Sequence, residues 1–189
     1  MASIPLSPLT EEQYLELERE AEAKSEFHDG QMFAMSGGTL NHSLLGTRMA
    51  ALLDRHTPPG CRAFNSELRI KVAAAGLFTY ADCGVFCGEP QFAGDRRDII
   101  LNPSLIVEVL SPSTEGYDRG KKFESYRTIP TFREYVMVHQ DRPHVEHYSR
   151  QDDGSWLLRD HTGIDDTLTI ASLNIQIPLA DLYSAALND

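Results

Sequence analysis

The 189-residue sequence lacks several features that would place it at once in a common class of protein. No apolar run approaches the length of a membrane-spanning helix, so we expect no membrane association. The first ten residues, MASIPLSPLT, contain no basic stretch followed by an apolar one, and no signal peptide is predicted. Neither a P-loop nor the glycine fingerprint of dinucleotide-binding folds occurs. These absences exclude the commonest phosphate-binding motifs and favour a cytoplasmic protein.

Cysteine is also scarce. The chain has three cysteines, Cys61, Cys83 and Cys87, and an odd number of thiols without a secretion signal indicates a reducing cytoplasm. If Cys83 and Cys87 share one face of a strand, they lie about 13 Å apart, which is too far for one zinc ion. We therefore expect no disulfide framework and interpret Cys83 and Cys87 as small core residues.

Positive charge is in short supply as well: 17 lysines and arginines face 28 aspartates and glutamates, which gives a formal charge of −11. This balance argues against non-specific binding of nucleic acid, which depends on basic surfaces. Carboxylates that cluster around a divalent cation produce the same acidic balance. What the chain does have is an ordinary globular composition, 41% apolar and 24% charged, with no internal repeat. We expect one domain over 1–189.

Hydrophobic periodicity predicts a mixed α/β fold. Helices are expected over 11–23, 39–56, 118–129 and 179–187. Strands are expected over 64–73, 77–88, 105–110, 133–140, 144–150, 155–160, 166–170 and 173–177. A further hairpin is indicated by Asp29-Gly30 between two half-apolar runs. The succession of strands near the C-terminal end favours an antiparallel meander there.

The segment NPSLIVEVLSPST contains the most unexpected residue of the chain. Its central strand is apolar except for Glu108, and burial of an unpaired carboxylate is costly. Asp82 is similarly isolated in FTYADCGVF. If the two strands are neighbours, both carboxylates can remain ionised around a shared Mg²⁺ ion, which prefers oxygen ligands. The alternative is that Glu108 forms a salt bridge with Arg119, Lys121 or Lys122 of the following helix.

Helical geometry separates the two adjacent lysines of that helix. Three apolar residues fall within one stripe about 120° wide: Phe123, Tyr126 and Ile129. Lys122 lies about 40° from the centre of this stripe, whereas Lys121 lies about 140° away and should face solvent. Arg119, about 20° from the centre but in the first turn, is the best substitute for Lys122. A lysine beside paired carboxylates can position a water molecule or stabilise negative charge on a phosphate.

Four segments together resemble the Uma2 family of predicted endonucleases: FHDGQMFAMSGGTLNHS, YADCGVFCGE, NPSLIVEVLSPSTEGYDRGKKFESYR and REYVMVHQDRPHVEHYSR. The resemblance extends over nearly the whole chain from about residue 10. It implies the restriction-endonuclease-like fold of the PD-(D/E)XK superfamily. That fold has an αβββαβ core in which helices flank a mixed sheet, and here a C-terminal antiparallel β extension follows.

The resemblance also implies a metal site. The two acidic residues of the superfamily motif fall on Asp82 and Glu108, and the carbonyl of Val109 is the third expected metal ligand. The chain departs from the motif at Leu110, which stands in the place of the motif lysine. In Uma2 sequences this lysine is expected on the following helix, here as Lys122.

Three further residues are accessory candidates: Glu26, His42 and Tyr126. Glu26 and His42 match the family pattern. For His42, a core histidine with a satisfied hydrogen bond is an equal alternative, because the residue falls near the apolar stripe of its helix. For Glu26, the alternative is a solvent-facing charge on a hairpin.

The sequence thus predicts an endonuclease that uses Mg²⁺ or Mn²⁺ to hydrolyse phosphodiester bonds of nucleic acid, with DNA as the expected substrate. One alternative is a catalytically silent nuclease-fold module that binds or regulates, which the acidic charge favours slightly. A second alternative is a structural protein whose carboxylates only form ion pairs. A homodimer is left open.

Overall fold

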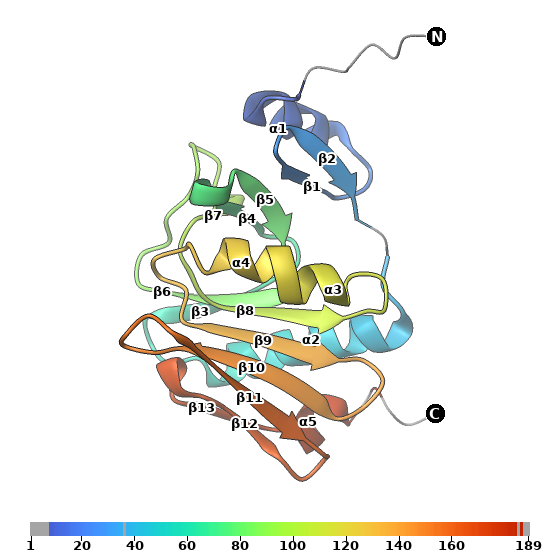
Figure 1. Cartoon of the computed structure of the whole chain (residues 1–189), viewed down its shortest axis with the longest axis vertical. Coiled ribbons are helices and arrows are strands. Elements are labelled where there is room, and N and C mark those ends of the chain that lie inside the picture. The colour runs from blue at the N-terminus through green and yellow to red at the C-terminus, as the bar shows by residue number, and fades with distance from the viewer. Residues whose placement is uncertain (1–7, 36, 185, 187–189) are drawn as a thin grey trace.

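The computed structural model describes residues 8–35, 37–184 and 186, and helices alternate with strands along the chain (Figure 1). The helical elements are α1 (Glu11–Glu20), α2 (Leu40–His56), η1 (Ala73–Ala75), α3 (Glu115–Tyr117), η2 (Asp118–Lys122), α4 (Phe123–Tyr126), η3 (Ala171–Leu173) and α5 (Leu179–Tyr183). The strands are β1 (Ser25–His28), β2 (Gln31–Ala34), β3 (Cys61–Asn65), β4 (Arg69–Val72), β5 (Leu77–Tyr80), β6 (Cys83–Cys87), β7 (Ile99–Ile100), β8 (Pro103–Leu110), β9 (Glu134–His139), β10 (His144–Arg150), β11 (Trp156–Thr162), β12 (Thr167–Ile170) and β13 (Ile175–Pro178).

A six-stranded mixed sheet forms the centre of the molecule, in the order β11-β10-β9-β8-β6-β3. Strands β3, β6 and β8 pair antiparallel, β9 joins β8 in parallel, and β10 and β11 continue antiparallel. Because α2 precedes β3 and the helical segment 115–126 connects β8 to β9, the order of elements is αβββαβ. The structure confirms the predicted core, its flanking helices and the C-terminal antiparallel extension.

Apolar side chains cover both faces of this sheet, with the two-residue alternation of a strand. On one face, α2, α5 and the β12–β13 pair pack on Val85, Leu105 and Val107, all fully buried. On the other face, the segment 115–126 and the strands β4 and β5 pack on Ile106 and Tyr135. Figure 1 shows the helical segment on the near side of the sheet and α2 on the far side.

A second sheet of five strands carries the N-terminal hairpin, in the order β2-β1-β5-β4-β7. The predicted turn at Asp29-Gly30 joins β1 to β2, and these residues have φ angles of 50° and 78°. Helix α1 begins with a capping box of Thr10 and Gln13 and buries Tyr14 in a small aromatic core. The hairpin is thereby fixed above the central sheet, with β1 paired to β5.

Two predicted strands are each divided in the structure. The range 64–73 contains the end of β3, a turn, and β4, because Asn65 Oδ1 accepts the N–H of Glu67 at 3.1 Å and turns the chain. The range 77–88 contains β5 and β6, which belong to different sheets. Asp82, predicted within a strand, therefore lies in the bend between them. The prediction of two continuous strands is wrong because the apolar pattern runs across both breaks.

The predicted helices are correct in position but differ at their ends. Helix α1 stops at Glu20, three residues before the predicted end. The helix predicted over 118–129 instead covers 115–126, and its middle, η2, is a π-helical turn in which Gly120 has φ −100° and ψ −105°. Helix α5 ends at Tyr183, and some residues of its predicted range 179–187 lie outside the described part of the chain.

The cysteine prediction needs correction. Cys61 and Cys87 are directly opposite each other on β3 and β6 and form a disulfide, with Cα atoms 3.9 Å apart. The expectation of no disulfide, and of Cys87 as a free core residue, is therefore wrong, whereas Cys83 is a buried free thiol. The disulfide could not be predicted because it depends on the pairing of β3 with β6, and most of β3 lies outside the predicted strand 64–73. Since disulfides are uncommon in reducing compartments, the pair also weakens the argument for a cytoplasmic location.

We predict that reduction of the Cys61–Cys87 disulfide destabilises the fold. The bond joins residues 26 apart in sequence, and closure of a loop of that size contributes about 3 kcal/mol through the entropy of the unfolded chain. Thermal unfolding with and without a reductant, followed by circular dichroism, measures the effect. In the control variant Cys87→Ala, the reductant should not shift the midpoint. Equal midpoints for the oxidised and reduced wild-type protein would contradict the prediction.

Candidate active site

Glu108 projects from β8 toward the helical segment 115–126 and is 4% exposed. Its Oε1 atom accepts hydrogen bonds from Lys122 Nζ and from the Tyr126 hydroxyl, both at 3.0 Å. Both donors reach the carboxylate because the segment packs on the sheet through buried side chains, Phe123 and Tyr126 among them. Burial raises the pKa of Glu108 well above its usual value. The isolated carboxylate of the central strand is therefore held by a cation and a phenol.

Lys122 is shared by three carboxylates. Its Nζ atom lies 3.0 Å from Glu108, 3.3 Å from Glu26 and 3.7 Å from Asp118. It also donates a hydrogen bond to the carbonyl of Tyr80 at 3.2 Å. Burial alone would lower the pKa of Lys122, but the carboxylates outweigh this effect and raise the pKa above its usual value. The ammonium group therefore stays charged at neutral pH.

The cluster carries more negative than positive charge. When all groups are ionised, the cluster has a formal charge of −2, because the one ammonium of Lys122 is surrounded by three carboxylates, those of Glu26, Glu108 and Asp118. Burial raises the pKa of Asp118 as well, so the cluster favours an additional proton or cation. Glu26, on β1, is 8% exposed rather than solvent-facing, and it also accepts a hydrogen bond from the Thr79 hydroxyl.

Asp82 lies at the break between β5 and β6, beside the end of β8. Its Oδ2 atom accepts the backbone N–H of Val109 at 2.7 Å. The same atom is 3.5 Å from Nε2 of His42, in the first turn of α2. The side chain of Asp82 is 21% exposed, so this end of the site opens to solvent. The structure thus places Asp82, Glu108, Val109 and His42 around the carboxyl-terminal end of one strand.

Two carboxylate oxygen atoms at this strand end accept no hydrogen bond within the described part of the chain. In the described residues, no hydrogen bond reaches Oδ1 of Asp82 or Oε2 of Glu108. Together with the carbonyl of Val109, they are the hard oxygen donors that Mg²⁺ prefers. No three histidine, cysteine, aspartate or glutamate side chains of residues 8–35, 37–184 and 186 are grouped so as to hold a metal ion. Because Mg²⁺ keeps several water ligands and needs one or two carboxylates, this donor set fits it.

Sequence reasoning misses Asp118, a member of the buried cluster that is 3% exposed. A signal was present, since Asp118 precedes Lys122 by four residues, a spacing at which side chains meet on a helix. Its burial could not be predicted, because an aspartate at the start of a helix is ordinarily solvated. It is buried here because it lies 3.7 Å from Lys122, which also contacts Glu26 of the N-terminal hairpin at 3.3 Å. Figure 1 shows this hairpin above the segment 115–126.

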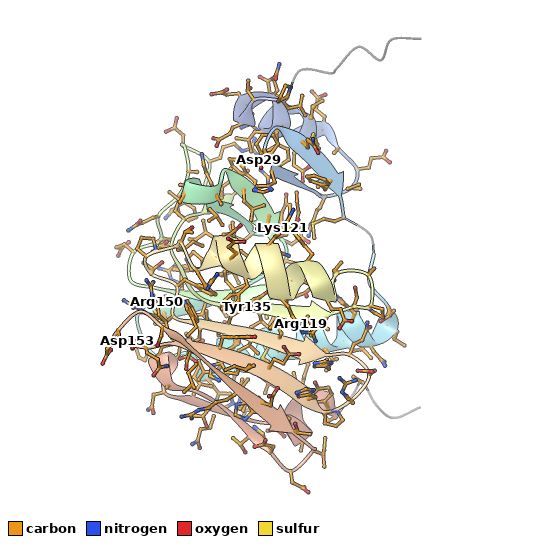
Figure 2. The ribbon with its side chains drawn as sticks, viewed as in Figure 1. Asp29, Arg119, Lys121, Tyr135, Arg150 and Asp153 are labelled. Carbon is orange, nitrogen blue, oxygen red and sulfur yellow. A yellow bond between two sulfur atoms is a disulfide. The ribbon has the colours of Figure 1, made fainter. Side chains whose placement is uncertain are left out.

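The other basic residues of the helical segment face elsewhere. Lys121 is exposed, and Figure 2 shows it on the opposite edge of the segment from Arg119. Arg119 binds Glu146 of β10 through Nε and Nη2, and the shorter contact is 2.7 Å. Glu146 is also bonded to Nε2 of His139 at 2.9 Å. Arg119 therefore fastens the segment to the sheet, and Lys122 is the cation at the carboxylates.

A pocket of about 690 Å³ opens at the same edge of the sheet. Its lining comes from three segments: the start of α2, the exit of β8 and the turn after β9. One lining residue, Leu110, follows Glu108 by two positions and lies on the same strand face. The pocket therefore lies at the end of the strand that carries Glu108, two residues beyond that carboxylate. A second pocket, of about 330 Å³, lies between α1 and the loop before β7, away from the end of β8. The residues of the carboxylate cluster line neither pocket.

Known structures define the class of fold. The crystal structure of "a putative nuclease belonging to DUF820" from Anabaena variabilis is similar over 95% of this chain and 100% of its own, with a TM-score of 0.75 and 21% identity. The fold is thus the restriction-endonuclease-like fold that the sequence predicts. The family model of Uma2, described as "Putative restriction endonuclease", matches residues 11–180. The chain belongs to the Uma2 family, which confirms the resemblance seen in the sequence.

Two uncharacterized proteins of Synechocystis sp. are similar along most of their length. One is 36% identical over 184 residues, which cover 96% of this chain and 94% of the relative. The other is 36% identical over 172 residues, which cover 88% of this chain and 95% of the relative. In the part of the chain that the structure describes, none of the helices combines the length and the apolar character needed to cross a membrane.

We predict that Glu146→Gln destabilises the protein in a pH-dependent way. Burial alone would raise the pKa of Glu146, but the hydrogen bonds from Arg119 and His139 outweigh it and hold the pKa below the usual 4.5. Such a group stabilises the fold above its unfolded pKa and loses this effect as the pH falls through the folded value. The variant should therefore be less stable by about 2 kcal/mol at pH 7.

This difference should begin to shrink as the pH falls below about 4.5, where the carboxylate becomes protonated in the unfolded chain, and it should be lost as the pH falls through the lower pKa of the folded protein. Urea unfolding of both proteins at pH 7 and at about pH 3.5 measures it. A difference that stays the same at both pH values would show that the carboxylate charge does not fasten the segment.

Proposed function

We propose that this Uma2 protein is an endonuclease that hydrolyses phosphodiester bonds of nucleic acid with Mg²⁺ or Mn²⁺, and that DNA is its substrate. The observation that carries the proposal is the pair of unused oxygen atoms, Asp82 Oδ1 and Glu108 Oε2, at one strand end beside the buried ammonium of Lys122. If the Lys122–Glu108 ion pair were purely structural, the partly exposed carboxylate of Asp82 beside it would have no role in it. The description of the family as restriction endonucleases supports DNA as the substrate.

In this proposal, Asp82, Glu108 and the carbonyl of Val109 would hold the cation, which when bound would polarise the phosphate and lower the pKa of the attacking water. Lys122 orients that water or stabilises the negative charge that develops on the phosphate. The ammonium can do so because it is held charged at a fixed position, 3.0 Å from Glu108.

The accessory residues hold these groups in place. The Tyr126 hydroxyl binds Oε1 of Glu108 and so directs Oε2 away from the helical segment. His42 contacts Oδ2 of Asp82, the atom that the backbone of β8 also holds, and so limits rotation of that carboxylate. Glu26 keeps the Lys122 ammonium charged and within reach of the site.

We predict that Lys122→Ala lowers the cleavage rate at least about a hundredfold, the usual scale for loss of such a group. Lys121→Ala is the matched control and should have little effect, because that side chain is exposed. Cleavage of plasmid and oligonucleotide DNA with Mg²⁺ or Mn²⁺ measures both rates, and circular dichroism verifies that both variants fold. Equal losses in the two variants would remove Lys122 from the mechanism.

We also predict that Mg²⁺ or Mn²⁺ raises the melting temperature of the wild-type protein in a concentration-dependent way, since a ligand of the folded state stabilises it. Asp82→Asn and Glu108→Gln should abolish both this shift and cleavage, because each removes a charged oxygen ligand. Calorimetric titration with Mn²⁺ provides an independent measure of binding. Metal binding without cleavage would favour the catalytically silent module. The absence of both metal binding and cleavage would favour a structural protein whose carboxylates only form ion pairs.

A further inference from the structure

We infer that the pocket of about 690 Å³ beside the carboxylates holds an unpaired nucleobase next to the scissile phosphate. The inference rests on the proposed nuclease function and adds a substrate class to it: single strands, or duplexes from which a base has been turned out. The volume of the pocket is within the range of ligand pockets, roughly 300–1,000 Å³. Three properties support it: the position of the pocket, the balance of its charges and the polar groups in its wall.

The first property is position. Strands β8 and β9 are parallel, and the pocket lies at their carboxyl-terminal ends, where Leu110 is paired with His139. Ligands of open α/β sheets bind at such ends. Glu108 precedes Leu110 on the same strand face, so a nucleotide whose phosphate is at the carboxylates has the pocket as its neighbour.

The second property is the balance of charge. Each charged side chain of the lining has an opposite charge beside it: Arg142 lies 3.1 Å from Asp141, and Glu115 lies 2.7 Å from Arg119. Burial lowers the pKa of His139, so its imidazole is neutral at pH 7. With little uncompensated positive charge, the pocket does not suit a phosphate group. A neutral base is the part of a nucleotide that such a wall accepts.

The third property is the chemistry of the wall. Leu40 presents an apolar side chain that is 69% exposed, a surface on which the face of a base can lie. The Thr39 hydroxyl accepts the N–H of His42 and donates its own hydrogen to Gln140 Oε1, which leaves Gln140 Nε2 with no partner in the described residues. Asn41 donates Nδ2 to the carbonyl of Gln140 at 3.4 Å, which leaves its Oδ1 atom available.

The pocket therefore offers one amide donor, from Gln140, and one amide acceptor, from Asn41. Asparagine and glutamine amides recognise the adjacent donor and acceptor of a base edge, most often adenine. In a duplex the faces of a base are stacked and its pairing edge is occupied. Only an unpaired or extruded base can enter a pocket of this kind, and enzymes that take such a base provide hydrogen bonds together with apolar contact.

The first experiment measures binding of two probes in EDTA, so that no cation and no catalysis are involved. Ligand-observed NMR titration compares deoxyadenosine 5′-monophosphate with deoxyribose 5-phosphate, which lacks the base. The nucleotide should bind and the sugar phosphate should not. Asn41→Ala and Gln140→Ala should each weaken nucleotide binding roughly fivefold, the usual effect of one lost hydrogen bond. Gln176→Ala, an exposed amide on β13 outside the pocket, is the control and should bind as the wild type does.

The second experiment measures cleavage of a single-stranded oligonucleotide and of its duplex. The wild type should prefer the single strand, and Asn41→Ala should raise KM for it about fivefold while kcat changes less than about twofold, since binding is lost and chemistry is not. Circular dichroism verifies that the variants fold.

Three results would overturn the inference: equal binding of both probes, wild-type binding by both amide variants, or no binding of the nucleotide up to about 10 mM. Nucleotide binding without any cleavage would instead refute the nuclease proposal and support base binding by the pocket. Cleavage without base-dependent binding would refute the pocket and support the nuclease.

Discussion

The buried ammonium of Lys122 is the contact on which the arrangement of the site depends. It lies among Glu26, Glu108 and Asp118, which come from β1, β8 and η2. Each carboxylate would be costly to bury alone, and the ammonium would be too, but together they compensate much of that cost. The cluster joins the N-terminal hairpin, the helical segment and the central sheet at one point, which couples the stability of these elements to the geometry of the site.

The break between β5 and β6 is the second constraint. It lets the chain pass from the five-stranded sheet to the six-stranded one, and Asp82 is at the crossing. Because its Oδ2 atom is fixed by the N–H of Val109, the backbone of β8 orients the carboxylate. The same strand therefore carries Glu108 and positions Asp82. A rigid strand is a suitable support for groups that must be held accurately.

Features that depend on local pattern were predictable from the sequence. The mixed α/β succession follows from alternating and helical apolar patterns, whereas the αβββαβ core was implied by the family resemblance. The angle of Lys122 on its helix predicted that it, rather than Lys121, is buried. Features that depend on pairing between distant segments were not. The division of the strand 77–88 is decided by two different partner sheets. The disulfide of Cys61 depends on strand register, and burial of Asp118 depends on a cluster that includes Glu26 of the distant hairpin.

An acidic chain that acts on a polyanion has to obtain its affinity from short-range contacts. At a formal charge of −11 it has no general attraction for nucleic acid, because that attraction comes from clustered lysine and arginine. The surplus of carboxylates around Lys122 has a different effect, since it favours a divalent cation, and a bound cation reverses the sign of the local field. A wall of paired charges beside it, such as Arg142 with Asp141, adds little repulsion. The acidic composition is therefore compatible with the proposed chemistry, because the cation rather than the protein surface presents positive charge to the phosphate.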